Sequence, residues 1–228
     1  MNFISHFYLD RHLNDSSFFT GVSTPDLVSV FDRTIRLKAR KMPLLMENEA
    51  TPDEISFYQG VLRHFEGDRI FHTSTFFEEE TGRINEILHD AFGDQVERGF
   101  FIAHILFELL LDKILIQHDS SLLTEFYHHL TARPVKEYVR LTEWVTRVPM
   151  PSYDGFLKKF IRKRYLYRYT DWEHVIYILK RIVMGVGIQK VEYLHSSTFL
   201  NEMLAYESEL SMRSIPSMAN LNDQLCKV

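Results

Sequence analysis

Apolar residues recur at every third or fourth position along most of the chain, and strictly alternating runs are scarce. This period is typical of amphipathic α-helices, in which such residues share one face. The chain has 228 residues, and about 100–200 residues form a typical domain. We therefore predict an all-α, single-domain multi-helix bundle over residues 1–228. Within it we expect a core at 1–132, further helices at 133–213 and a loose tail at 214–228.

Capping residues place individual helices within this pattern. The segment 24–26, Thr-Pro-Asp, predicts a helix start, because proline is favoured at the first helical position. Thr51 and Glu54 have the spacing of a capping box and predict a long helix that runs to about Glu80. A second long helix is expected over residues 94–118.

Charge and cysteine content narrow the class of protein. The chain carries 26 Lys and Arg against 31 Asp and Glu, a net charge of −5, which argues against nucleic acid or anionic membranes as the main partner. The single cysteine, Cys226, excludes an intrachain disulfide.

The most apolar stretch, 100–116, is interrupted by polar residues and is shorter than the roughly 20 residues of a membrane span. With no signal peptide at its start, the chain is expected to be soluble and cytoplasmic.

The candidate chemistry lies on the two long predicted helices. Each carries three ligand-type side chains at positions i, i+4 and i+8: His64, Asp68 and His72 on the first, and His104, Glu108 and Asp112 on the second. A step of four residues turns only about 40° around a helix axis, so each set forms one stripe. The second helix is apolar on almost every side, which predicts that it is buried.

A buried carboxylate without a partner costs several kcal/mol, so Glu108 and Asp112 require compensation. A divalent cation shared by the two helices would provide it, and imidazole with carboxylate suits Zn, Mn or Fe. Residues eight apart lie about 12 Å apart along the axis, too far to hold one ion. We therefore expect Asp68 or Glu108 to bridge two ions, the arrangement common in phosphodiester hydrolysis.

Ordinary structural roles are the alternative for these side chains. A single histidine is more often a core or surface residue than a ligand, and a buried acid can pair with an arginine. Arg63, Arg69 and Arg98 lie near the two stripes in sequence.

The strongest basic run of the chain spans residues 158–168, with tyrosines interleaved. Such a surface can steer an acidic protein partner, or it can be a solvated helix face. Together with Arg63, next to His64, four members of the run are candidate substrate-binding residues: Lys159, Arg162, Lys163 and Arg164.

Several motifs resemble the acyl-carrier-protein phosphodiesterase family. They are the opening MNFISHFYL, the segment Gly21 to Asp26, GVLRHFEGD at 60–68, the spacing Glu108-x3-Asp112-x5-His118, and KFIRKRYLYRYTDW at 159–172. Together they cover nearly the whole chain, and their order is more specific than any one of them.

This resemblance implies a helical, metal-dependent enzyme of fatty acid and lipid metabolism that removes 4'-phosphopantetheine from holo-acyl carrier protein. By position, it implies site roles for His6, Asp26, His64, Asp68, Asp112 and His118. Two residues depart from the family pattern: His72 stands where an Asp is expected, and His104 where no ligand is expected. The order of His and acidic residues also resembles zinc-dependent phospholipases C, which share an early His and a Pro-Asp.

The expected function is therefore metal-dependent phosphodiester hydrolysis. Asp68 and Glu108 are expected to bridge or anchor the ions, and the expected terminal ligands are His64, His72, His104 and Asp112. His6 and Asp26 are expected to complete the ligand shell. His118 is the expected general acid. Asp26 is alternatively expected to orient the attacking water. Two other functions stay open: a phospholipase C-like or other phosphodiesterase, and a helical binding module without catalysis. The oligomeric state is not predicted.

Overall fold

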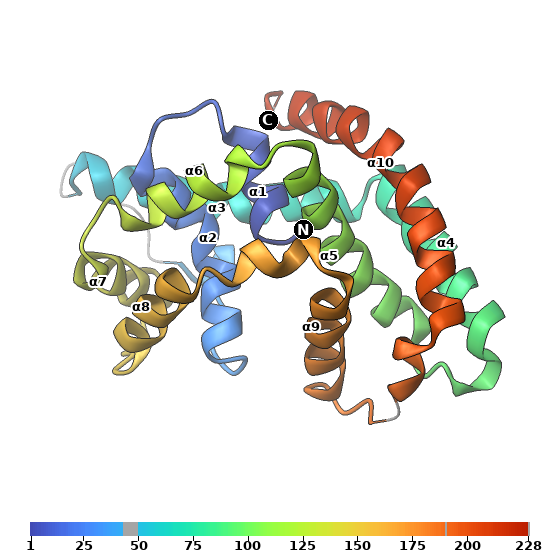
Figure 1. Cartoon of the computed structure of the whole chain (residues 1–228). Helices are drawn as coiled ribbons and strands as arrows, with labels where there is room; N and C mark the ends of the chain where they lie inside the picture. The colour runs from blue at the N-terminus through green and yellow to red at the C-terminus, as the bar shows by residue number, and fades with distance from the viewer. Residues whose placement is uncertain (43–49, 190, 228) are drawn as a thin grey trace. The chain divides into compact units, whose positions relative to one another are not determined.

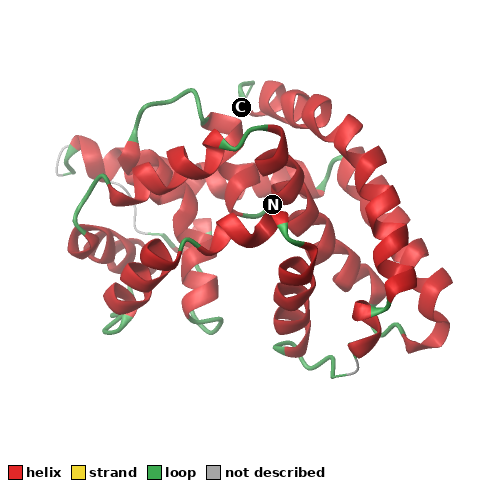
Figure 2. Cartoon of the chain, in the orientation of Figure 1, coloured by secondary structure: helices red, strands yellow, loops and turns green. Residues whose placement is uncertain are grey.

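The computed structural model describes residues 1–42, 50–189 and 191–227, and within these ranges it contains helices, turns and loops but no strand (Figure 2). The all-α prediction is confirmed. The α-helices are α1 (Phe3–Asp10), α2 (Ser16–Phe31), α3 (Pro52–His72), α4 (Thr75–Phe92), α5 (Gly99–His118), α6 (Ser121–Thr131), α7 (Val135–Thr146), α8 (Tyr153–Lys163), α9 (Trp172–Met184) and α10 (Ser197–Leu225) (Figure 1). Short 3-10 helices lie at Ala39–Lys41, Gly93–Gln95, Tyr165–Thr170 and Glu192–His195.

The helices form two compact units, each built from separate stretches of sequence. Unit 1 comprises Met1, Phe3–Arg69 and Ser121–Leu166, and unit 2 comprises Asn2, Ile70–Ser120 and Tyr167–Val228. Helix α3 belongs to unit 1 up to Arg69, and its last three residues belong to unit 2. Beyond the first three residues, the boundaries therefore lie at 69/70, 120/121 and 166/167, whereas the sequence pattern placed a division at 132/133.

In unit 1, α1 packs against α2 and α6, α2 packs against α6, and α7 packs against α8. Aromatic rings fill the core of this unit. The ring centroids of Phe3 and Phe160 are 5.5 Å apart, and those of Phe7 and Phe19 are 4.7 Å apart. These helices supply the framework on which the first group of candidate ligands is mounted.

Two glycines bring the backbones of α2 and α3 into direct contact. A Cβ atom on Gly21 would come within 3.0 Å of the Phe57 carbonyl, and one on Gly60 within 3.0 Å of the Phe18 carbonyl. Only glycine allows this approach without displacing one of the helices. The contact fixes the position of the residues that follow on each helix, Asp26 on α2 and His64 on α3.

In unit 2, α5 packs against α4, α9 and α10, and α10 runs beside α4 (Figure 1). The predicted burial of α5 is confirmed, since most of its side chains from Ile102 to Ile116 are buried. Its buried Lys113 forms an ion pair with Glu207, which also accepts a hydrogen bond of 2.6 Å from the indole of Trp172. Within the described residues, no helix has both the length and the apolar character required to cross a bilayer.

Two predicted helix boundaries need correction. The helix that begins after Thr51 ends at His72, because Ser74 caps a new helix by accepting a hydrogen bond from Phe77 N at 3.1 Å. Residues 94–98 precede α5, which begins at Gly99. The capping box itself is confirmed: Thr51 N donates to Glu54 Oε2 at 2.9 Å, and Glu54 N donates to Thr51 Oγ1 at 3.3 Å.

The predicted helix start at 24–26 is wrong, because Pro25 lies inside α2. This helix begins at Ser16, where the Asp15 side chain accepts a hydrogen bond from Phe18 N at 3.0 Å and satisfies an N-terminal amide. Proline at an interior position removes one backbone hydrogen bond. Because α2 runs from Ser16 to Phe31, Asp26 lies in the second half of this helix.

The predicted loose tail at 214–228 is also wrong, because α10 continues to Leu225. Met218, Leu221 and Leu225 are spaced by three and four residues, and all three are buried. Pro216 is accommodated inside the helix. Burial of this apolar stripe explains why the segment is ordered as helix.

Candidate functional site

Six of the predicted ligands form two triads, one in each unit. In each triad the nitrogen and oxygen atoms lie within 4.8 Å of one another. The unit 1 triad is His6, Asp26 and His64, and the unit 2 triad is His72, His104 and Glu108. Both triads offer two imidazoles and one carboxylate.

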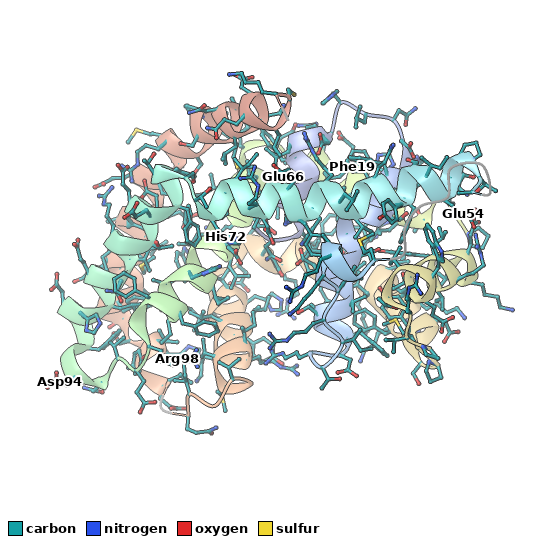
Figure 3. The ribbon with its side chains drawn as sticks, turned by 180° about the vertical axis from the view of Figure 1, so that it is seen from behind. Phe19, Glu54, Glu66, His72, Asp94 and Arg98 are labelled. Carbon is teal, nitrogen blue, oxygen red and sulfur yellow. The ribbon has the colours of Figure 1, made fainter. Side chains whose placement is uncertain are left out.

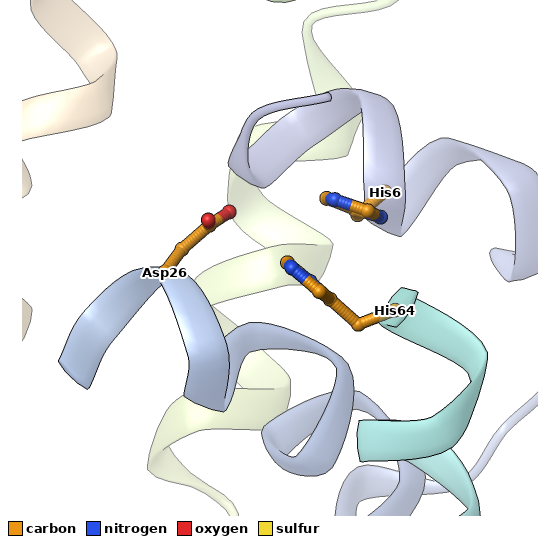
Figure 4. Close-up of side chains that lie close together, drawn as sticks. All are labelled: His6, Asp26 and His64. Atoms are coloured by element: carbon orange, nitrogen blue, oxygen red, sulfur yellow. The ribbon is translucent and has the colours of Figure 1, made fainter. Parts of the chain in front are cut away.

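The unit 1 triad is assembled by three helices, with His6 on α1, Asp26 on α2 and His64 on α3 (Figure 4). Both histidines are buried, with exposed fractions of 4% and 3%. Because Gly21 and Gly60 hold α2 against α3, the carboxylate and the His64 imidazole converge although they lie 38 positions apart in sequence (64 − 26).

The tautomer of His64 is fixed by the backbone. His64 Nδ1 lies 3.0 Å from the Val22 carbonyl oxygen, which can only accept a hydrogen bond, so Nδ1 carries the proton. The lone pair is then on Nε2, which lies 3.6 Å from Asp68 Oδ2. A backbone carbonyl that orients an imidazole in this way is typical of histidines that bind metal ions.

His6 is stacked on His64, with ring centroids 3.9 Å apart and planes inclined by 22°. Its Nε2 lies 3.1 Å from Asp68 Oδ1, which also accepts a hydrogen bond of 2.8 Å from the backbone amino group of Met1. Gly67 leaves room for this arrangement, since a Cβ there would lie 2.9 Å from Met1 Cε and 3.5 Å from His6 Nδ1. Asp68 thus supports the unit 1 triad from its edge.

Burial and neighbouring charges set the protonation of this group. Burial lowers the pKa of His64 well below 6.5, and the adjacent His6 lowers it further. Burial alone would raise the pKa of Asp68, but His6, the Met1 amino group and His64 outweigh it and hold that pKa well below its usual value. A neutral imidazole beside an ionised carboxylate is the state that metal ligands require.

The donor set fits a divalent ion. Two imidazoles, one carboxylate and a nearby second carboxylate match the ligands of Zn, Mn and Fe sites, whose bonds are about 2.0–2.2 Å long. The donor types of the unit 1 triad therefore fit such an ion.

The unit 2 triad is formed by the last residue of α3, His72 (Figure 3), and two residues of α5. Glu108 Oε1 lies 3.0 Å from His72 Nε2 and 3.1 Å from His104 Nε2. Burial alone would raise the pKa of Glu108, but hydrogen bonds from the two imidazoles help to hold it well below its usual value.

Other predicted site residues lie outside both triads. Asp112 is fully buried on α5, and His118 is exposed as the last residue of that helix. Arg63 forms a bidentate pair with Asp10, through Nε–Oδ2 at 2.8 Å and Nη2–Oδ1 at 2.7 Å. The expected dinuclear centre would take its ligands from both units, since Asp68 belongs to unit 1 and Glu108 to unit 2. Its bridging by either carboxylate stays a prediction.

The basic residues of α8 belong to unit 1. Lys159, Arg162 and Lys163 are exposed and, at spacings of three and four, share one face of the helix. Arg164 ends the helix with φ of 47° and places its guanidinium 5.7 Å from the Tyr127 ring centroid. Lys159, Arg162 and Lys163 are therefore available to a partner, whereas Arg164, although exposed, also contributes to packing.

Every triad member is among the ligands predicted from the sequence, but the groups that position them are not. Gly60 stood inside a predicted helix, where a glycine is a signal of close packing, whereas Gly21 preceded the predicted helix start at 24–26. The Val22 carbonyl and the aromatic contacts of Phe77 could not be recognised, because they depend on which helices meet.

No protein-family model matches the chain, and no curated protein or solved structure matches it either. The likeness to acyl-carrier-protein phosphodiesterases therefore depends on the motifs of the sequence alone.

Proposed function

We propose that this protein is a metal-dependent phosphodiester hydrolase whose reaction takes place at the unit 1 triad. The observation that supports it most is the convergence of His6, Asp26 and His64 from three helices to within 4.8 Å, with both imidazoles buried. A fixed tautomer and an ionised supporting carboxylate, Asp68, add to the fit. The motifs shared with the phosphodiesterase family point to the same residues.

Each residue has a distinct role in this proposal. A bound divalent ion would activate a water molecule and offset the charge of the phosphoryl oxygens. His6, His64 and Asp26 would hold it, and Asp26 is also suited to orient the attacking water. The Val22 carbonyl keeps the lone pair of His64 on Nε2, and Asp68 keeps His6 in place.

The departing oxygen needs a proton. The expected general acid, His118, belongs to unit 2 and is therefore given no role at the unit 1 triad.

The proposed substrate is holo-acyl carrier protein, from which the phosphodiester to serine would be cleaved. The family resemblance supports this choice. The exposed cations Lys159, Arg162 and Lys163 on α8 offer a surface for an acidic protein.

The test uses the full chain, stripped of metal and reconstituted with Mn²⁺, Fe²⁺ or Zn²⁺. Holo-acyl carrier protein and bis(p-nitrophenyl) phosphate are assayed side by side. We expect the His64→Ala variant to lose at least about 100-fold in kcat/KM on both substrates, since it removes a ligand of the reacting centre. The control His12→Ala alters an exposed histidine of the same unit and should leave both rates unchanged.

Other outcomes separate the alternatives. Activity on the aryl ester alone would favour a phosphodiesterase with a different substrate, such as a phospholipase C-like enzyme. No activity with any of the three metals would favour a binding module. Full activity of the His64→Ala variant would contradict the proposed site.

A further inference from the structure

We propose that His72, His104 and Glu108 form a second metal site, which binds one divalent first-row transition-metal ion such as Zn²⁺ or Co²⁺ independently of the unit 1 triad. All three residues belong to unit 2, so this site is complete within one compact unit. The inference does not require phosphodiesterase activity.

The distances are those of ligands around one ion. Two ligand atoms about 2.1 Å from the same ion lie roughly 3.0–3.4 Å apart, depending on octahedral or tetrahedral geometry. Glu108 Oε1 is 3.0 Å from His72 Nε2 and 3.1 Å from His104 Nε2. An ion can thus be accommodated by small side-chain movements.

The ligand pair on α5 is held by helix geometry. His104 and Glu108 are four residues apart and therefore lie one turn apart on the same face. His72 is contributed by the last turn of α3, and the imidazole rings of the two histidines are 4.9 Å apart. Two ligands from one rigid helix and one from another element make a site that folding itself assembles.

Aromatic side chains fix the two imidazole rings. The Phe77 ring makes T-shaped contacts with His72 and His104, with ring centroids 4.8 Å and 4.9 Å apart and interplanar angles of 81° and 83°. Phe77 is in turn packed on Phe71 and Phe107, at 5.1 Å and 5.9 Å. An apolar shell of this kind restricts ligand movement and lowers the local dielectric constant, which strengthens metal binding.

The site is also accessible. The side chains of His72 and His104 are 31% and 36% exposed, whereas that of Glu108 is 14% exposed. Only three protein ligands are present, so water would fill the other coordination positions of a bound ion. Two imidazoles and one carboxylate favour a borderline transition metal over Mg²⁺ or Ca²⁺, which prefer all-oxygen ligands.

A simple imidazole–carboxylate pair is the competing explanation. One carboxylate oxygen can accept hydrogen bonds from both imidazoles, so the two distances to Glu108 Oε1 fit a hydrogen-bonded cluster as well as three ligands of one ion. The two explanations differ in a measurable quantity, the number of ions bound.

The experiment measures Co²⁺ binding to the metal-free full chain by equilibrium dialysis, with the visible absorption of Co²⁺ as a second readout. We expect two equivalents for the unmodified protein. The variants His104→Ala and Glu108→Gln should each lose one equivalent. The Co²⁺ affinity of that equivalent should fall by more than the roughly 10–100-fold that removal of an outer-shell partner produces. The control His89→Ala, an exposed histidine of unit 2, should keep both. Circular dichroism verifies that each variant is folded.

The outcomes also separate this inference from the proposed function. A His64→Ala variant should keep the equivalent that His104→Ala loses. If the unmodified protein binds one ion that His104→Ala loses and His64→Ala keeps, the unit 2 site is supported while the proposed catalytic centre fails. If His104→Ala and Glu108→Gln keep every equivalent, or if either loses both, the independent site is refuted.

Discussion

The two triads use the same side-chain chemistry but are built in different ways. The unit 1 triad draws one residue from each of three helices and buries both imidazoles, at 4% and 3% exposure. The unit 2 triad takes two ligands from one helical turn and leaves its imidazoles about one third exposed. Burial with a fixed tautomer favours a preorganised reaction centre, whereas an open site favours exchange of an ion with solvent.

The largest effect should come from the backbone contact of Gly21 and Gly60, on which the unit 1 triad depends. In Gly60→Ala the new methyl group would overlap the Phe18 carbonyl and force α2 away from α3. We expect a loss of about 2–5 kcal/mol in the free energy of unfolding, measured with urea, and loss of phosphodiesterase activity. Gly155→Ala is the matched control, since a Cβ there meets nothing within 4 Å and alanine is the better helix former. Equal stability of the two variants would contradict the close-contact explanation.

Asp68 tests how far the unit 1 triad depends on its supporting carboxylate. Asp68→Asn removes the charge that faces His6 and His64, so metal affinity should fall by about 10–100-fold, as for other outer-shell partners. Isothermal titration with Zn²⁺ measures this change. Glu66→Gln, which alters the partner of Arg69 on the same helix, serves as control and should bind Zn²⁺ normally. An affinity loss of the same size in both variants would show a general charge effect.

Substitutions on the basic face of α8 test whether this face binds the protein substrate of the unit 1 triad. The triple substitution Lys159→Ala, Arg162→Ala and Lys163→Ala should lower kcat/KM on holo-acyl carrier protein by about 10-fold, mainly at low salt, through slower association. The rate on bis(p-nitrophenyl) phosphate should stay unchanged.

A triple substitution of equal charge elsewhere in unit 1 provides the control for α8. Arg36, Lys38 and Arg40 are also exposed, and their replacement by alanine should spare both substrates. If the two triple variants are equally impaired on the carrier protein, α8 is not a specific docking surface.

The smallest effect concerns a buried histidine that belongs to neither triad. His129 Nδ1 is 2.9 Å from Ser16 Oγ, and burial lowers the pKa of His129 below 6.5. Between pH 7 and 5.5 the unfolded chain binds a proton that folded His129 resists, so stability should fall as the pH falls. His129→Gln should reduce this dependence by less than about 1.4 kcal/mol, the value of one pKa unit. Urea unfolding at the two pH values measures it, and an unchanged pH dependence would contradict the assignment.

Local features of the fold were predictable, and long-range ones were not. The Thr51–Glu54 capping box and the burial of α5 follow from spacing and apolar content alone, and both are found. The helix break at Ser74 was missed because the apolar period continues across it. The helical end of the chain was missed because Pro216 and polar residues obscure the stripe that includes Met218.

The candidate site shows the same limit. Helical spacing predicted that His64 and His72 share one helix and that His104 and Glu108 share another, and they lie on α3 and α5. It could not divide them into two groups, because that division depends on where α3 ends and on the contact made by Gly60. Such contacts between distant segments leave little trace in a single sequence.

Anomalous X-ray diffraction from crystals soaked in Zn²⁺ tests most directly whether each triad holds one metal ion. We predict one anomalous peak bound by His6, Asp26 and His64, and a separate peak bound by His72, His104 and Glu108. Absence of density at the first triad, with its side chains still in place, would contradict the proposed reaction centre.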